Sequence, residues 1–581
     1  MIERTCRQSG EKFEITKTDL KFYAKMGVIT AEQLEKLASL PVDESVSVRE
    51  EKIPQELLVG LPTLCESERQ RRRMCWRNER KLYQRKCDGT GKTMVSVYDD
   101  KTSFPVYSQD YWWSDNWDAT DYGKDFDFSK PFFEQFQSLL QTVPQIALWN
   151  NESENSDYNN CCFFNKNCYL NFNTDHSEDS CYNYMLCDGV EVFDSVGVLK
   201  SELCYECLDC ENGYELKYSQ NCKNCSDSWF LQNCIGCSNC FGCVNLRNKE
   251  YYFLNEKCTP EEYEAKLDTL NLTKNSSLKN FRTSFVQFCL KFGQKYSIQE
   301  QSENCTGNYI RQSKDCVNSF DLLGKCDSVK NFDYGFNSNF VHEALAVGNA
   351  KYAYEVSSGD KISDSCFIQG IKDGPHMSYY SMNCVNNSQN CFGCVGLKKR
   401  QYCILNKQYT QEEYEALVSQ IIEHMKKTGE WGEFFPAELS PFAYNETVAQ
   451  EYFPLTKEEI VRRGYKWKEE KHNFQYTGPK YEMPDDIADV PDDIVNKVLE
   501  CERSGKFYRI QPAELRFYRK MNLPIPRLHP DERHKDRVNL RNPRKLWQRT
   551  CADCGCKIQT TFAPNRPEKI LCEACYLKVV D

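Results

Sequence analysis

The sequence has few histidines and no long hydrophobic run. Only 7 of the 581 residues are histidine, and none stands in an HExxH motif, which excludes that class of zinc hydrolase. No apolar run approaches the ~18 residues that a membrane helix requires, and the first residues, MIERTCRQSGEKF, lack the apolar segment of a secretory signal. The net charge of −11 argues against nucleic acid coating the whole chain. We therefore expect a soluble, cytoplasmic protein without a membrane partner.

Cysteine, by contrast, is abundant. The chain has 34 cysteines, and in a reducing compartment thiols serve more often as metal ligands than as disulfides. A chain of this length also holds several domains, each with its own core.

The two ends of the chain are copies of each other. CRQSGEKFEITKTDLKFYAKM (6–26) matches CERSGKFYRIQPAELRFYRKM (501–521) at an offset of 495, and RNERKLYQR (77–85) matches RNPRKLWQR (541–549) at an offset of 464. The change of offset places an insertion in the first copy, including a helix over 30–40 with Thr30 and Gln33 as its capping box. The sequence therefore predicts a duplicated end module.

The C-terminal copy carries a pattern typical of a four-thiolate metal site. Its spacing, C-x2-C-x17-C-x2-C, lets two cysteine pairs surround one tetrahedral ion. We predict one Zn²⁺ site with Cys556 as a bystander, and the expected ligands are Cys551, Cys554, Cys572 and Cys575.

The matching stretch of the N-terminal copy has lost most of these ligands. With a one-residue gap in the alignment, the four ligand positions fall on Cys87, Thr90, Tyr107 and Asp110. Such a set cannot bind zinc in the usual way, so we expect aromatic packing to replace the ion there.

Each module also begins with half of a metal site. The candidate ligands, weaker than those above, are Cys6 and Cys65 in the first copy and Cys501 and His529 in the second. Two interpretations stay open: relics held by packing, or partial occupancy with Glu68 and Glu532 contributing.

A dense basic cluster lies between these half-sites in both copies. Arginine beside aromatic residues suits phosphate contact and base stacking, so RNA, the ribosome or an acidic protein is a possible partner. The alternative is that the arginines pair with the acidic body of the same chain. The candidate partner-binding or nucleic-acid-binding residues are Arg71, Arg72, Arg73, Arg77, Arg80, Lys81, Arg85, Arg537, Arg541, Arg544, Lys545 and Arg549.

The middle of the chain repeats with a regular step. Cys204, Cys222 and Cys240 are each eighteen positions apart, as are Cys366 and Cys384. Such a step equals one coil of a left-handed β-helix with three sides of six, in which asparagines can form ladders at the turns. Three roles for these thiols stay open: stacking in the core, metal loading, and disulfides.

This solenoid is itself duplicated. NCFGCVNLRNKEYYFLNEKCTPEEYEAKL (239–267) and NCFGCVGLKKRQYCILNKQYTQEEYEALV (390–418) are related at an offset of 151. Each ends in a helix with a capping box, begun by Thr259 and Thr410 respectively, that covers an open solenoid end.

The expected fold is multidomain and mainly β: a duplicated cysteine-rich β-solenoid flanked by two zinc-ribbon-like α+β modules, with capping helices. The expected division is a ligand-depleted N-terminal zinc-ribbon-like module with an aromatic and acidic extension (1–145), a first Cys/Asn-rich solenoid (146–258), a capping helix and linker (259–300), a second solenoid (301–407), a capping helix (408–428), a loosely ordered linker (429–495) and a C-terminal zinc-ribbon module (496–581).

The order of these blocks resembles one family. The terminal ribbons, RNxRKL[YW]QRxC, YWWSDxWD and NCFGCV(N/G)L are similar to those of uncharacterised cysteine-rich zinc-ribbon/β-solenoid proteins, found mostly in candidate-phylum bacteria with reduced genomes. Some of these carry the label CaiB/BaiF, a CoA-transferase name, which no CoA-binding pattern supports in this chain. The resemblance implies the architecture and no activity.

Three functions are open on these observations. The first is a non-catalytic zinc-binding scaffold whose arginine-rich ends bind nucleic acid or an acidic protein, with avidity from the paired modules. The second is a metal-handling protein that uses the solenoid cysteines. The third is an enzyme with an unrecognised site, for which no HExxH or nucleophile motif accompanies the histidines.

Overall fold

The computed structural model describes residues 1–40, 47–348, 350, 353–359, 362–370, 376–469, 476–478 and 480–580. These form two compact units. Unit 1 contains Met1–Leu148, Ser297–Lys468 and Arg544–Leu546, and unit 2 contains Trp149–Tyr296, Glu469–Pro543 and Trp547–Asp581. Each unit combines stacked coils from the middle of the chain with segments from one chain end. Among the described residues, no helix has the length and apolar character needed to cross a membrane.

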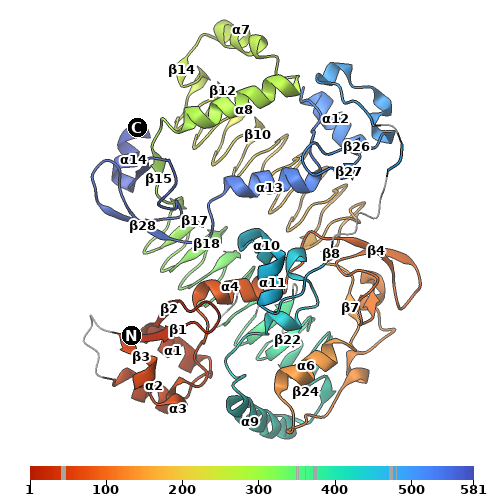
Figure 1. Cartoon of the computed structure of the whole chain (residues 1–581), viewed down its shortest axis with the longest axis vertical. Helices are drawn as coiled ribbons and strands as arrows, with labels where there is room; N and C mark the ends of the chain where they lie inside the picture. Colours follow the sequence, from red (N-terminus) through yellow and green to blue (C-terminus); the bar gives the residue numbers. More distant parts are fainter. Residues whose placement is uncertain are drawn as a thin grey trace. The chain divides into compact units, whose positions relative to one another are not determined.

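Both units are multi-sheet structures in which helices and strands are mixed. The elements of unit 1 are β1 (Ile2–Thr5), β2 (Lys12–Ile15), α1 (Lys17–Lys25), α2 (Ala31–Ala38), β3 (Val48–Arg49), α3 (Gln55–Leu58), α4 (Glu66–Met74), β4 (Tyr83–Lys86), β5 (Thr93–Ser96), β6 (Val106–Tyr107), α5 (Gln109–Trp113), α6 (Phe132–Leu140), β7 (Gln145–Ile146), β16 (Gln299–Glu300), β17 (Gly307–Arg311), β18 (Ser319–Leu322), β19 (Asp333–Gly335), β20 (Ser357–Ser358), β21 (Cys366–Gly370), β22 (Tyr379–Met382), β23 (Gln389–Phe392), β24 (Gln401–Ile404), β25 (Lys407–Gln408), α9 (Gln411–Thr428), α10 (Val448–Tyr452) and α11 (Lys457–Arg462). Those of unit 2 are β8 (Asn150–Asn151), β9 (Cys162–Phe163), β10 (Tyr214–Lys217), β11 (Ser226–Trp229), β12 (Ser238–Phe241), β13 (Glu250–Phe253), β14 (Glu256–Lys257), α7 (Pro260–Leu270), α8 (Asn275–Cys289), β15 (Gln294–Lys295), β26 (Leu499–Glu500), β27 (Phe507–Tyr508), α12 (Pro512–Lys520), α13 (Pro530–Leu540), β28 (Trp547–Thr550), β29 (Lys557–Thr560), β30 (Ile570–Leu571) and α14 (Glu573–Val580) (Figure 1).

The middle of the chain winds into stacked coils of twelve residues each. In the first coil stack (residues 150–255), parallel bridges join positions twelve apart on four sides, as in Glu154 to Lys166 and Asn160 to Phe172. The four bridge positions of a coil are three residues apart, and every third residue, such as Asn167 with φ 53°, has left-handed backbone. The expected coil of eighteen is therefore wrong. Both lengths are multiples of the three-residue side, so the cysteine spacing alone fits either one.

The inward position of each side is filled by small side chains. Cys204, Cys207 and Cys210 are fully buried, and the Cys207 Sγ lies 3.4 Å from the carbonyl oxygen of Leu216 in the next coil. Every described cysteine is a free thiol, so no disulfide joins the coil cysteines, and their burial fits stacking in the core. Outward asparagines form the expected ladder, with 3.1 Å from Asn155 Nδ2 to Asn167 Oδ1.

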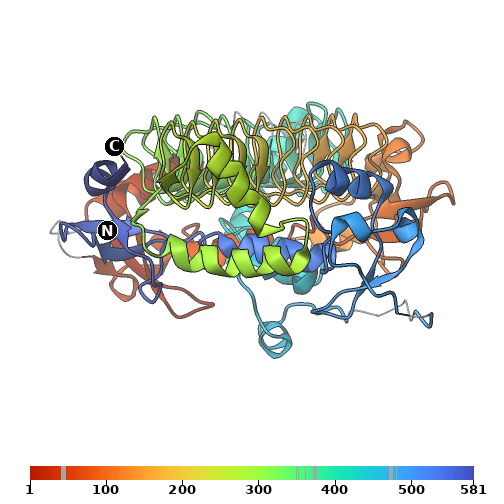
Figure 2. The same ribbon diagram turned by 90° about the horizontal axis from the view of Figure 1, so that it is seen from above.

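The second coil stack (residues 297–406) follows the same plan with small irregularities. Its bridges advance by eleven positions from Gln299 to Ile310, by thirteen from Phe320 to Asp333 and by twelve from His342 to Tyr354. Each stack ends in the predicted helix, α7 or α9, and both capping boxes are formed. Figure 2 shows α8 running alongside the coils of the first stack, where its phenylalanines pack against the coil face.

The two end modules contain corresponding elements. Helix α1 corresponds to α12, α4 to α13, the β4–β5 hairpin to β28–β29, and the parallel pair β6–β7 to β30–β15. Helix α2 is the insertion of the first copy, with the predicted capping box of Thr30 and Gln33.

Residues 429–495 are not a loose tether where the structure describes them. Trp431, Phe434 and Phe435 are buried in the core of unit 1, and Ile487 and Ile494 in that of unit 2. The proline and aspartate content of this segment suggested a linker, but its apolar residues have cores to enter. Residues 470–475 and 479 lie outside the described residues.

Candidate functional site

Four thiols of the C-terminal ribbon (residues 547–580) converge at one point. The sulfur atoms of Cys551, Cys554, Cys556 and Cys572 all lie within 4.8 Å of one another. The Sγ atoms of Cys554 and Cys572 are 3.7 Å apart. Over the described part of the chain, no other group of three or more potential metal ligands is gathered this closely.

The backbone of the first cysteine pair creates this geometry. The Cys551 N–H donates to the carbonyl of Cys556 at 2.8 Å, and Gly555 donates back to the carbonyl of Cys551 at 3.0 Å. This turn requires left-handed backbone at Gly555 (φ 73°), which glycine adopts without strain. Burial raises the pKa of the Cys551 thiol. Backbone N–H groups that donate to its sulfur, among them that of Cys572 at 3.3 Å, together have the larger effect and lower the pKa to about 6. The site thus favours a thiolate.

Three of the four predicted ligands meet in the cluster, and Cys556 joins them. The sulfur atom of Cys556, expected to be a bystander, lies close enough to the other three to be a candidate ligand as well. Cys575, the fourth predicted ligand, is buried in α14 beside the cluster. A hydrogen bond with Asp553 raises the pKa of this thiol most, and burial and the neighbouring thiols raise it further. Five thiols thus surround a space in which a tetrahedral ion needs four.

The N-terminal ribbon (residues 83–113) has the same turn without the ligands. Gly91 (φ 72°) donates to the carbonyl of Cys87 at 2.8 Å, and the Ser108 N–H lies 3.3 Å from the Cys87 Sγ. Ser108 therefore takes the place of Cys572, and Tyr111 that of Cys575, at the constant offset of 464. The alignment with a one-residue gap, which placed Tyr107 and Asp110 at these two ligand positions, is therefore wrong. The Tyr111 ring covers Gly89 so closely that no side chain fits at that glycine.

The two half-sites hold no comparable ligand group. The Cys65 Sγ lies 3.7 Å from Ser9 Oγ, and the Glu68 carboxylate pairs with Arg71 at 2.6 Å instead of facing a metal site. In the second copy, Cys501 is buried, and the His529 Nδ1 accepts from the Asp531 N–H at 3.1 Å. Packing is therefore the better interpretation of both half-sites, including Cys6, which is also buried.

The arginines of the predicted basic cluster are largely paired inside the chain. Arg72, Arg73, Arg77, Arg85 and Arg537 are buried, and Lys545 is exposed. A buried guanidinium that already pairs with a carboxylate has no surface to offer a phosphate, so the nucleic-acid interpretation fails for these five in this conformation. Acidic partners within the chain are recorded for Arg71, Arg72, Arg73, Arg77, Arg80, Arg85, Arg537, Arg541 and Arg544. Arg549 Nη1 donates to the carbonyl of Ala563, and Lys81 is half-buried.

No family model, curated protein or solved structure matches this chain.

In unit 1, the N-terminal module docks on the second coil stack through buried ion pairs. Arg69 Nε donates to Glu343 at 2.6 Å, Arg73 pairs with the same carboxylate, and Arg72 Nη2 lies 2.6 Å from Glu355. Burial raises the pKa of Glu343, but Arg69 and Arg73 lower it to about 2. The pairs hold α4 on the coil face.

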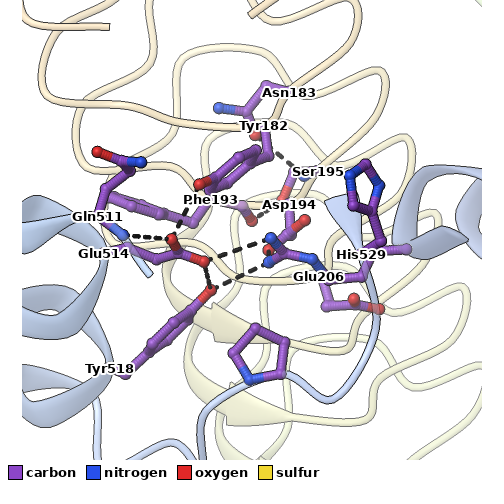
Figure 3. Close-up of polar contacts among 12 residues, drawn as sticks. Tyr182, Asn183, Phe193, Asp194, Ser195, Glu206, Gln511, Glu514, Tyr518 and His529 are labelled. Carbon is purple, nitrogen blue, oxygen red and sulfur yellow. Dashed lines mark hydrogen bonds and ion pairs between the residues drawn. The ribbon is translucent and has the colours of Figure 1, made fainter. Parts of the chain in front are cut away.

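Unit 2 repeats this arrangement at the same offsets. Arg533 and Arg537, the counterparts of Arg69 and Arg73, both pair with Asp194, the counterpart of Glu343 at an offset of 149. Figure 3 shows the neighbouring Glu514, which accepts from Tyr182 at 2.9 Å and Tyr518 at 2.7 Å. Burial raises the pKa of Glu514. The polar atoms of this centre are used in docking the module.

The docked modules differ in one aromatic pair. Phe22 stacks on His342 with ring centroids 3.5 Å apart in unit 1, whereas Phe517 stacks on Phe193 at 4.0 Å in unit 2. Burial lowers the pKa of His342 from 6.5 to about 4. The unfolded chain therefore binds this proton more tightly than the folded unit.

We expect His342→Phe to remove part of the acid sensitivity of unit 1. The stabilisation from neutral His342 is present above pH 6.5 and is lost as the pH falls towards 4, by on the order of 2–3 kcal/mol. Amide exchange of α1 and α4 between pH 7 and 4 measures it. Phe193→His should transfer the sensitivity to α12. Equal acid sensitivity of the wild type and His342→Phe would contradict the assignment.

The sequence left open that the arginines pair with acidic residues of the same chain, but it did not identify which ones. The signal was present, because Asp194 and Glu206 recur as Glu343 and Glu355 at an offset of 149. The sequence alone could not assign these carboxylates to the duplicated arginines, because it does not say which coil faces which module.

Proposed function

We propose that this protein is a non-catalytic scaffold that binds one zinc ion through the cysteines of its C-terminal ribbon. The observation that supports zinc is the set of four sulfur atoms within 4.8 Å of one another. Zn–S bonds of about 2.3 Å in a tetrahedron separate sulfur atoms by about 3.8 Å, and the Cys554 and Cys572 sulfurs are 3.7 Å apart.

The donor set favours a structural role for the metal over a catalytic one. Catalytic zinc keeps a position open for water or substrate, whereas a site with enough thiolates is closed. Cys551, Cys554 and Cys572 supply three ligands, and Cys556 and Cys575 are the two candidates for the fourth. In this proposal the ribbon is a zinc ribbon, and the coil stacks are β-solenoids that present the end modules.

The partner class that we retain is an acidic protein. The arginines of both modules pair with carboxylates of the coils, which supports carboxylates as the groups that these modules bind. Because the buried arginines are already paired, a partner of either class would have to bind at cations that are more exposed.

Metal analysis of the purified full chain tests the zinc proposal. We expect one zinc per chain by native mass spectrometry, and none after the double substitution Cys551→Ser and Cys572→Ser. Cys87→Ser is the matched control, because it changes the same turn in the ribbon without a ligand set, and it should keep the ion. Cys556→Ser and Cys575→Ser, made singly, identify the fourth ligand.

Two results would count against this function. An unchanged zinc content in the double variant would remove the ribbon as the site. Several metal ions per chain, lost on substitution of coil cysteines such as Cys207, would favour the metal-handling alternative.

A further inference from the structure

Unit 2 contains an open pocket between its coils, α8 and the C-terminal module. Its volume is about 330 Å³, within the range of small-ligand sites. The rings of Tyr205 and Tyr218 line it from the coils, Arg282 from α8, and Arg503 and Arg533 from the module. The pocket therefore combines aromatic faces with positive charge.

The lining contains more cations than carboxylates, although Arg533 and Arg527 also pair with Asp194 and Asp485, which do not line the pocket. Five of its residues are lysine or arginine and three are acidic. The acidic ones include Glu206, which pairs with Arg282 at 3.0 Å, and Asp536, which pairs with Arg503 at 2.6 Å. The Arg503 side chain is 48% exposed, so its two-pronged pair with Asp536 is open to water and to another carboxylate.

In unit 1, residues 430–435 fill the place that corresponds to the pocket of unit 2. The lining residues Pro524, Pro526 and Arg527 correspond to Gly60, Pro62 and Thr63 at the module offset of 464. The coil residues Tyr205 and Glu206 correspond to Tyr354 and Glu355 at the offset of 149. Between the equivalents of these walls lies the segment EWGEFF, which we call the plug.

The Glu433 carboxylate anchors the plug. It accepts from the Thr63 N–H at 3.2 Å and from the Thr63 hydroxyl and Arg72 Nη1, both at 2.5 Å. Gly432 packs against the backbone of Gly60 so closely that no side chain fits there.

Aromatic contacts complete the fit. The Trp431 ring lies 5.9 Å from that of Tyr379 and 6.2 Å from that of Tyr380, and its Nε1 donates to the carbonyl of Val28 at 2.8 Å. An acidic, aromatic peptide thus fills this place in unit 1.

Unit 2 has no plug of its own at this point of the chain. Helix α9 ends at Thr428 and the plug follows, whereas α7 ends at Leu270 and α8 already begins at Asn275. The residues that form the walls have counterparts in both units, but the plug follows only α9 of unit 1. The pocket of unit 2 lies where unit 1 has the plug.

We propose that the pocket of unit 2 binds an acidic peptide segment of a partner protein, with a glutamate carboxylate entering between the walls that correspond to those around Glu433 in unit 1. This inference rests on the acidic partner in the proposed function. One wall differs, because Asp536 stands where unit 1 has Arg72. The cations that receive the carboxylate are therefore Arg503 and Arg282, with the exposed Lys279 at the entrance.

A peptide with the sequence of residues 428–437, TGEWGEFFPA, is a direct probe. We expect the labelled peptide to bind the full chain in fluorescence anisotropy, and the same peptide with glutamine in place of the Glu433 residue to bind at least tenfold more weakly. The chain variant Lys279→Glu with Arg503→Glu should lose at least tenfold in affinity. The matched control is Lys557→Glu, an exposed lysine of unit 2 that does not line the pocket, and it should bind normally.

Each contrary result has a definite meaning. Equal binding of both peptides, or undiminished binding to the double variant with an unchanged unfolding midpoint, would overturn the pocket assignment but leave the zinc scaffold standing. Competition by free glutarate at the affinity of the peptide would overturn the choice of a peptide. Zinc content, measured on the same samples, tests the scaffold separately. Absence of peptide binding by a zinc-loaded wild type would overturn this inference alone.

Discussion

Replacing Glu343 by glutamine should destabilise unit 1 by about 3–5 kcal/mol, because it leaves buried positive charge without its partner. Glu343 is 1% exposed and pairs with both Arg69 and Arg73, whose side chains are 4% and 1% exposed. Glutamine keeps the shape of the side chain and one acceptor oxygen but removes the charge. We expect amide exchange in α1 and α4 to become faster, while α12 and α13 of unit 2 stay protected.

The duplicated architecture supplies the matched control. Asp194→Asn removes the equivalent charge in unit 2, so it should expose α12 and α13 and leave α1 and α4 protected. Glu32→Gln, which breaks the exposed pair with Lys36, should change neither unit. If Glu343→Gln were as stable as the wild type, the arginines would have another way to be neutralised.

The coils show how far spacing alone can specify a fold. Cysteine at a fixed phase correctly predicted stacked, small inward side chains. The coil length was wrong because Cys204 and Cys222, although one and a half coils apart, both fall on the inward phase of a three-residue side. Only the bridges, such as Cys181 to Phe193, distinguish the shorter coil from the longer one. Asparagine, tolerant of positive φ, was the local hint of a turn at every third residue.

The candidate site was predictable where it depends on local sequence and not where it depends on docking. Cys551, Cys554 and Cys572 could be predicted because a tight turn brings an i, i+3 pair together. The proximity of Cys556 was not predicted because it depends on where the turn directs that side chain. The role of Arg73 was open because the sequence cannot say which carboxylate, among many, meets a given arginine in the fold.

Removing the metal should unfold the C-terminal ribbon while its N-terminal counterpart stays folded. Structural zinc contributes about 10–16 kcal/mol of apparent binding free energy in small zinc-dependent domains. The hydrophobic cluster of the C-terminal ribbon is small: Cys551, Leu571, Cys575 and Tyr576 are its buried members. We expect a strong chelator to abolish amide protection in the β28–β29 hairpin, with recovery on adding back zinc.

The N-terminal ribbon is the internal control for this experiment, because packing holds it together. Tyr98, Phe104 and Val106 are buried in a larger cluster, and Tyr98 stacks on Phe442 with ring centroids 5.1 Å apart. Tyr111 closes the space over Gly89, so the β4–β5 hairpin should keep its protection in chelator. Loss of protection in both hairpins would point to general destabilisation, and loss in neither would show that the C-terminal ribbon folds without metal. A loss confined to β28–β29 would mean that one fold is held by an ion at one end and by aromatic packing at the other.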